Sequence, residues 1–164
     1  MTRRSGLGAR IRATLGERLS RGRRPPRKTD AAGPARAAEP GFHIEYAPKA
    51  DGLPDPGEVV WTWVPYEEDA SQGKDRPVLI IGRRGDQLVG LMLTSKDHDR
   101  DAEQEAHWGR RWMDVGTGGW DSQRRPSEVR LDRLLTVDPN AVRREGARLD
   151  HTTFQAVVAD LPPR

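Results

Sequence analysis

The sequence predicts a mainly β fold, a small antiparallel β-barrel with one C-terminal helix, preceded by a disordered basic tail. Three observations support this prediction. From residue 55 onward, short apolar and β-branched runs alternate with turn residues. Near the C-terminus, apolar residues recur at helical spacing. Residues 1–40 carry eleven Lys and Arg against three Asp and Glu, a net charge of +8, and no aromatic residue.

Residues 1–50 are predicted to be a disordered tail and linker, and residues 54–162 the folded domain. A segment with so few apolar side chains cannot offset the entropy that it loses on ordering. Its few apolar residues recur every fourth position and would form one stripe of a basic helix suited to an anionic membrane or to RNA; they are Leu7, Ile11, Leu15 and Leu19. A solvated tail is the alternative. Frequent Pro and Gly make residues 22–41 typical of a linker.

Three strands are predicted in the first half of the domain. Residues 59–64 are β-branched and aromatic and lie between turn residues, which is typical of a buried strand. Residues 77–82 form a second run, in which Pro77 is tolerated at the first strand position. Residues 87–94 follow a short turn at 84–86 and pair back as a hairpin.

The second half of the domain is predicted to contain two more strands and the helix. Residues 96–107 are polar and acidic, so we expect a loop there. A short strand over 108–115 ends at a Gly-rich break, and residues 127–137 form a longer strand. Asp150 is placed to cap a helix whose apolar residues fall on one face: Phe154, Val157, Val158 and Leu161.

Several classes of protein are excluded by composition. The chain has no Cys, which excludes disulfides and thiolate chemistry and fits the cytoplasm, our predicted location. Its four His residues form no ligand-spaced cluster, so no metal or other cofactor is expected. Uncharged apolar runs such as Val78–Gly82 are far shorter than the ~20 residues that span a bilayer. No phosphate-binding Gly-rich loop is present.

Arg130 and Asp132 stand two residues apart in a predicted strand, so both side chains leave the same face of the sheet. A cation and a carboxylate so placed form either a structural salt bridge or part of a reactive site. The residues alone leave both readings open.

Four sequence motifs in order resemble one known family. They are Pro-Gly-Glu-Val-Val-Trp at 56–61, Gln-Gly-Lys-Asp-Arg-Pro-Val-Leu-Ile at 72–80, Leu-Thr-Ser at 93–95, and Val-Arg-Leu-Asp at 129–132 with Thr-Val-Asp at 136–138. Each motif is weak alone, but the ordered set spans nearly the whole predicted domain. The chain is similar to the PemK/MazF family of toxins from toxin–antitoxin systems.

This resemblance implies an SH3-like barrel that forms a homodimer and cuts single-stranded RNA as a metal-independent endoribonuclease. It also implies an antitoxin partner whose acidic segment occupies the RNA groove. The RNA 2′-OH would attack the phosphate and leave a 2′,3′-cyclic phosphate and a 5′-OH. The alternative is a catalytically silent barrel that binds RNA or a protein without cutting.

Carried over by motif, the site consists of Arg76, Thr94, Arg130 and Asp132. Asp132 would accept the 2′-OH proton, because it is the one carboxylate among these four residues. The two arginines would stabilise the transition-state charge, and Thr94 would add a neutral donor. Ser95 and Trp120 complete the predicted RNA-binding residues, Trp120 by stacking on a base; a core or dimer-contact role is the alternative for Trp120.

One segment departs from the family pattern. The loop after the first strand carries three consecutive acids, Glu67–Asp69. Beside an RNA groove these acids would repel phosphate and put RNA affinity and nuclease activity in doubt. If the loop instead extends into solvent, the groove is unaffected.

Overall fold

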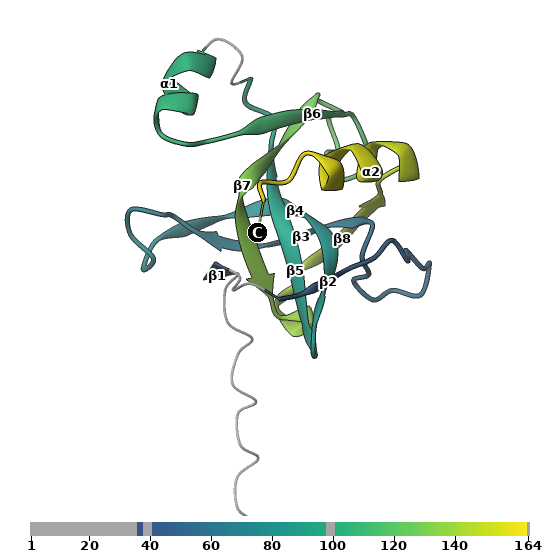
Figure 1. The fold of residues 1–164 in the computed structure, drawn as a ribbon. Coiled ribbons are helices and arrows are strands. Elements are labelled where there is room, and N and C mark those ends of the chain that lie inside the picture. Colours follow the sequence, from purple (N-terminus) through teal and green to yellow (C-terminus); the bar gives the residue numbers. More distant parts are fainter. Residues whose placement is uncertain (1–35, 38–40, 98–100, 164) are drawn as a thin grey trace, which may run out of the picture. The chain divides into compact units, whose positions relative to one another are not determined.

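The computed structural model describes residues 36–37, 41–97 and 101–163. The chain divides into two units, 1–30 and 31–164, and every described residue belongs to the second. The apolar stripe predicted within residues 7–19 therefore lies outside the described residues. The second unit is mainly β, with an antiparallel sheet curled into a half-barrel and a short C-terminal helix (Figure 1), which confirms the predicted fold class.

The sheet is built from eight strands whose main path runs β1-β7-β5-β4-β3-β8, with every pair antiparallel. Two short strands lie off this path, because β2 pairs with β4 and β6 pairs with β7. The bounds are β1 Arg36–Ala37, β2 His43–Ile44, β3 Glu58–Pro65, β4 Gly73–Arg84, β5 Gln87–Thr94, β6 Trp112–Gly116, β7 Ser127–Val137 and β8 Arg144–Arg148.

The predicted strands are all present, but β6 begins at Trp112 rather than at 108, and β4 is longer than expected. It begins at Gly73, so Pro77 lies within the strand rather than at its first position. Pairing of β4 with β5 begins only at Val78, so at Pro77 the strand pairs with β3 and has an open edge on its other side. Proline, which has no N–H to donate, is tolerated at such an edge position. The β4–β5 hairpin turns at Gly85, whose φ of +58° suits glycine.

The predicted loop over 96–107 is wrong at its end, because Ala102–His107 form the short helix α1. Its one buried residue is charged: Glu105 accepts a hydrogen bond from the Trp112 indole at 3.0 Å. A helix anchored through a paired carboxylate shows no apolar periodicity, so the sequence pattern gave no sign of it.

The sheet also includes residues that precede 54, the start predicted for the domain. β1 pairs with the end of β7, and β2 pairs with Arg83 and Gly82 of β4. Phe42 is buried in the core, and the Tyr46 hydroxyl donates to the Leu149 carbonyl at 2.8 Å. Backbone pairing of this kind requires little of the side chains, so composition alone did not reveal it.

Two hydrophobic cores lie on opposite faces of the sheet, because strand side chains alternate. The helix-side core is the larger and comprises Phe42, Val59, Leu79, Ile81, Val89, Leu91, Leu93, Val115, Trp120, Val129, Leu131, Leu149, Phe154 and Val157. The pocket-side core comprises Val60, Val64, Val78, Ile80, Leu88, Met92, Leu135 and Val137.

Helix α2 (His151–Ala159) packs on the helix-side core through Phe154 and Val157, and Figure 1 shows it lying across the curled sheet. The predicted cap is confirmed: the Asp150 carboxylate accepts a hydrogen bond from the Thr153 N–H at 2.9 Å. This bond satisfies one of the backbone donors that a helix leaves unpaired at its start. The helix covers one face of the sheet and leaves the other for a site.

Candidate active site

The four residues matched by motif lie on one face of the sheet. In β7, Val129 and Leu131 point into the helix-side core. Arg130 and Asp132 alternate with them along the strand and therefore face the opposite way. Thr94 follows Leu93 of the same core in β5 and also turns to the pocket side. Arg76 precedes Val78 and Ile80 of the pocket-side core by steps of two residues. Strand alternation thus brings together residues that are up to 56 positions apart in the sequence.

Three of them, Arg76, Thr94 and Arg130, line a pocket of about 230 Å³ over the pocket-side core, whose Val64 and Met92 lie at its wall. Five cationic and three anionic residues surround it: Arg76, Lys96, Arg110, Arg130 and Arg133, with Glu67, Glu68 and Glu105. The pocket is therefore net positive, although residues 41–164 together carry 17 Lys and Arg against 22 Asp and Glu. A net positive pocket is suited to an anionic ligand.

Arg130 is buried, at 6% exposure, and lies between two carboxylates. Its Nε lies 3.2 and 3.1 Å from the Asp132 oxygens, and its Nη2 lies 2.7 Å from Asp132 Oδ2. Its Nη1 and Nη2 donate to the two oxygens of Glu67 at 2.8 and 2.9 Å. This is a paired fork geometry, in which both carboxylates accept two-point hydrogen bonds from one guanidinium.

The ionisation of the three groups follows from this pairing. Burial alone would raise the pKa of Asp132, but hydrogen bonds from Arg130 and from the Arg111 N–H, at 2.7 Å, outweigh it and lower that pKa. The hydrogen bond from Arg130 likewise lowers the pKa of Glu67. Burial works against the charge of Arg130, yet hydrogen bonds to both carboxylates raise its pKa overall. All three groups are charged at neutral pH.

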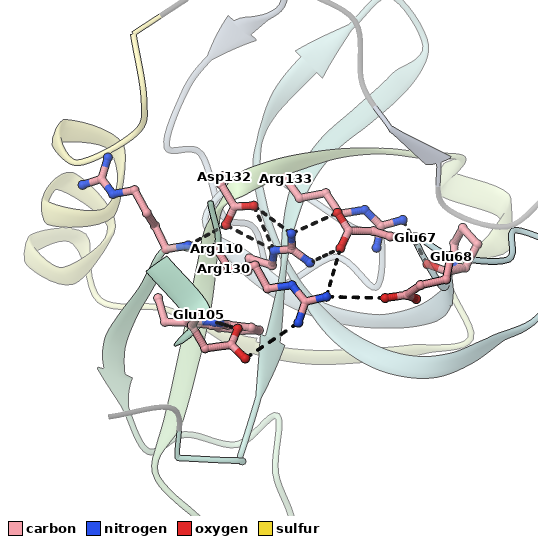
Figure 2. A network of polar contacts seen from close by, with 10 residues as sticks. Glu67, Glu68, Glu105, Arg110, Arg130, Asp132 and Arg133 are labelled. Carbon is pink, nitrogen blue, oxygen red and sulfur yellow. Dashed lines mark hydrogen bonds and ion pairs between the residues drawn. The ribbon is translucent and has the colours of Figure 1, made fainter. Parts of the chain in front are cut away.

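A second arginine extends the network (Figure 2). The Nη2 of Arg110 lies 3.4 Å from Glu68 and 3.8 Å from Glu67, and its Nη1 lies 3.7 Å from Glu105. The acidic loop between β3 and β4 is exposed over residues 66–72 but lies at the site. Of the two alternatives left open by the sequence, this arrangement favours the loop beside the groove, because two arginines hold Glu67 and Glu68 at the pocket.

Arg76 and Thr94 line the same pocket but are engaged differently. Arg76 is half-buried and, among the described residues, forms no ion pair. The Thr94 hydroxyl accepts a hydrogen bond from the Lys96 N–H at 3.2 Å, which leaves its own proton available to a ligand. Asp132 lies against the Nε edge of Arg130 and is absent from the pocket lining, so its predicted role as base stays a prediction.

A second pocket, of about 440 Å³, shares Arg76, Thr94 and Lys96 with the first. Ser95 is exposed and lines this second pocket, apart from Arg130. Trp120 also lines it but is 4% exposed and belongs to the helix-side core. Its indole N–H donates to Ser127 at 3.1 Å, and a Cβ added at Gly118 would lie 2.1 Å from its ring. This packing favours the core role for Trp120, while its RNA contact stays a prediction.

Sequence reasoning did not place four residues that complete the first pocket: Glu67 and Arg110 in loops, Trp112 in β6 and Arg133 in β7. Trp112 lies beneath Arg130, with the guanidinium carbon 6.0 Å from the ring centre. Arg133 donates to the Pro65 carbonyl at 3.0 Å. The acidic run was visible in the sequence, but nothing there indicated the arginines that it meets, since these come from distant elements.

Two further findings concern metals and membranes. Over residues 41–97 and 101–163, no three His, Asp or Glu side chains are grouped so as to hold a metal ion. In the same part of the chain, the helices are too short and too polar to cross a bilayer.

Comparison with known proteins identifies the family of the chain. A family model described as PemK-like, MazF-like toxin of type II toxin-antitoxin system matches residues 55–162, about two thirds of the chain. No curated protein matches the sequence. The matched range contains β3 to α2 and every residue of the first pocket. The chain therefore belongs to the PemK-like, MazF-like family of type II toxin–antitoxin toxins.

Proposed function

We propose that this chain is a toxin that cuts single-stranded RNA without a metal ion, by attack of the RNA 2′-OH on the adjacent phosphate. The observation that carries the proposal is the net positive pocket in which Arg76, Thr94 and Arg130 converge. The 2′-oxygen forms a bond to phosphorus and loses its proton, and the bond from phosphorus to the 5′-oxygen breaks. The products are a 2′,3′-cyclic phosphate and a 5′-OH, which takes its proton from solvent.

Charge stabilisation is the main task of the two arginines in this proposal. Arg76 offers a guanidinium without an ion pair among the described residues, and Arg130 offers one that is held in place by Asp132. Such preorganised donors act on the charge that develops on the phosphate oxygens in the transition state. Arg130 does not serve as a general acid, because its pKa is raised.

Asp132 has two possible tasks, which differ in their consequences. As the base, it must release one oxygen from Arg130 or from the Arg111 N–H before it can take the 2′-OH proton. As a positioning residue, it holds Arg130 and never meets the RNA. A pH–rate profile separates the two: Asp132→Asn removes the acidic limb in the first case, and lowers the rate while keeping that limb in the second.

The first experiment is a cleavage assay on the full chain. Mixed-sequence single-stranded RNA is incubated with the protein in EDTA, and the ends of the fragments are analysed. We expect cyclic phosphates and 5′-OH ends from the wild type. Arg76→Gln should lower the rate by roughly 10²-fold, the usual cost of one transition-state donor. Arg143→Gln is the matched control, since Arg143 is exposed and lines neither pocket.

One observation favours the second candidate, a barrel that binds RNA without cutting it. Arg130 already donates to two carboxylates, so the site as it stands has little capacity left for a phosphate. RNA binding by a folded protein, with no cleavage in EDTA at any concentration, would support this candidate over the nuclease.

The family also supports three further proposals: an antitoxin partner that neutralises the toxin, a homodimer, and action in the cytoplasm. The net positive pocket is suited to an acidic antitoxin segment. Light scattering of the purified chain at several concentrations tests the homodimer, and a constant monomer mass would contradict it.

A further inference from the structure

The Arg130–Glu67 pair has no part in the proposed chemistry. Glu67 accepts hydrogen bonds from Nη1 and Nη2 of Arg130 at 2.8 and 2.9 Å, whereas Asp132 meets Nε and shares Nη2 with Glu67. A phosphate would bind these same two nitrogens, because carboxylates and phosphates both accept the arginine fork. Glu67 therefore occupies the place that a phosphate needs.

Both anions cannot share the guanidinium. Arg130 carries one positive charge and already meets two carboxylates, so this small cluster is net negative before any ligand arrives. A phosphate added beside Glu67 would place another anion within a few ångströms in a partly buried site, where like charges repel strongly. One carboxylate must leave before the phosphate can bind.

The structure distinguishes which carboxylate leaves. The Asp132 side chain is 17% exposed, stands on the same strand as Arg130, and also accepts the Arg111 N–H. The Glu67 side chain is 38% exposed and comes from a loop in which residues 66–72 are all exposed. Releasing Glu67 leaves Arg130 paired with Asp132, so that no unpaired charge remains buried.

The loop can move as a unit without unfolding. Its own hydrogen bonds close it, from the Tyr66 N–H to the Gln72 carbonyl at 2.9 Å and from the Gln72 N–H to the Asp69 carbonyl at 3.1 Å. The Asp69 carboxylate accepts further bonds from Ser71 and Gln72. The ion pairs of its two glutamates at the pocket are those with Arg110 and Arg130, and both glutamate side chains are already partly exposed, so water can solvate them when the loop leaves.

We propose that Glu67 is an internal competitor of the RNA phosphate: it closes the site by occupying the Arg130 fork, and RNA binds only when Glu67 leaves. The inference rests on the proposed function and names the regulation of the same site. The structure is then the closed form of the pocket, in which Glu67 occupies the Arg130 fork. The observed affinity for RNA is then the intrinsic affinity multiplied by the fraction of molecules in which Glu67 has released Arg130.

The test measures binding separately from cleavage. The probe is a mixed-sequence oligonucleotide with 2′-O-methyl groups throughout, which has no 2′-OH to attack. Glu67→Gln keeps the shape of the side chain and removes its charge, so the full-length variant should bind the probe on the order of tenfold more tightly than the wild type. Glu68→Gln is the matched control: it removes one charge from the same loop, at a residue that pairs with Arg110 alone, and should change the affinity less than about threefold.

Glu67→Asp provides a second variant that keeps the charge. Aspartate is one methylene shorter and holds the Arg130 fork less well, so the affinity should fall between that of the wild type and that of Glu67→Gln. Equal gains for Glu67→Gln and Glu68→Gln would overturn the proposal, because they would show a general charge effect. An unchanged or weaker affinity for Glu67→Gln would overturn it as well.

Cleavage of unmodified RNA then separates this proposal from the nuclease itself. Lost cleavage at unchanged affinity in Glu67→Gln would assign Glu67 to proton transfer and overturn the competitor role. A tenfold gain in affinity without cleavage by any form of the protein would contradict the nuclease and uphold the competitor. With both proposals correct, Glu67→Gln raises kcat/KM in proportion to its affinity.

Discussion

At the scale of single residues, Arg130 is held in one orientation by Asp132 before any ligand arrives. Its guanidinium donates hydrogen bonds to Asp132, two positions along the same strand, and to Glu67 in the loop between β3 and β4. A buried arginine without such partners would be strongly destabilising. The same contacts that make the arginine useful to a phosphate therefore also make it part of the folded structure.

This double role predicts a pH-dependent loss of stability in Asp132→Asn. The pKa of Asp132 is lowered by folding, so its carboxylate stabilises the protein above its unfolded pKa of about 4 and ceases to do so as the pH falls through its lower folded value. We expect Asp132→Asn to lower the free energy of unfolding by about 1–3 kcal/mol at pH 7. That difference should shrink below about pH 4.

Urea unfolding at pH 7 and at pH 3.5 measures the difference. Asp86→Asn, at an exposed turn, is the control and should have little effect at either pH. A constant difference between wild type and Asp132→Asn at both pH values would show that the charge of Asp132 is not what stabilises the fold.

At the scale of elements, the sequence predicts those whose stability comes from apolar side chains. β3, β5 and β7 contain runs of buried apolar residues, α2 has apolar residues at helical spacing, and all four were predicted at nearly their observed bounds. The helix α1 and the strand β8 have no such pattern: one is anchored by the buried carboxylate of Glu105, and the other pairs along β3 with a polar sequence. Their positions depend on partners that only the folded chain supplies.

The same distinction applies to the site. The motifs grouped Arg76, Thr94 and Arg130 in one site, and strand alternation placed Arg130 and Asp132 on one face, since the spacing along a strand decides which side a residue faces. They could not place Glu67, because its position depends on a loop conformation and on Arg110 from another part of the chain. A site residue that is held by an ion pair across 63 positions has no local signal in the sequence.

Helix α2 offers a prediction that depends on one capping residue. Asp150 accepts a hydrogen bond from the Thr153 N–H, and the helix is only nine residues long, so its first turn matters. Asp150→Ala should lower the free energy of unfolding by about 1 kcal/mol, whereas Asp150→Ser should retain most of the stability. Thermal denaturation compares the three proteins, and equal losses in both variants would show that the cap bond contributes little.

At the scale of the whole molecule, segments far apart in the sequence are joined on the helix side. Tyr46 donates to the carbonyl of Leu149, 103 positions away, and its ring lies 4.7 Å from that of His151 and 5.0 Å from that of Phe154. A Cβ added at Gly57, whose φ is +97°, would lie 2.7 Å from the Tyr46 ring. The segment before the family match therefore packs against both ends of the matched domain.

This packing predicts that Tyr46 contributes to the stability of the entire sheet rather than of its own segment. Tyr46→Phe removes the hydroxyl alone and should cost about 0.5–1.5 kcal/mol, since it leaves the Leu149 carbonyl without this donor. Tyr46→Ala also removes the ring contacts with α2 and should cost about 2–4 kcal/mol. Urea unfolding should remain a single transition in both variants, because one cooperative unit contains β2, the sheet and α2. If Tyr46→Ala unfolds at the same urea concentration as the wild type, residues 42–46 do not pack on the domain in solution, and the domain begins near 54 as the sequence predicts.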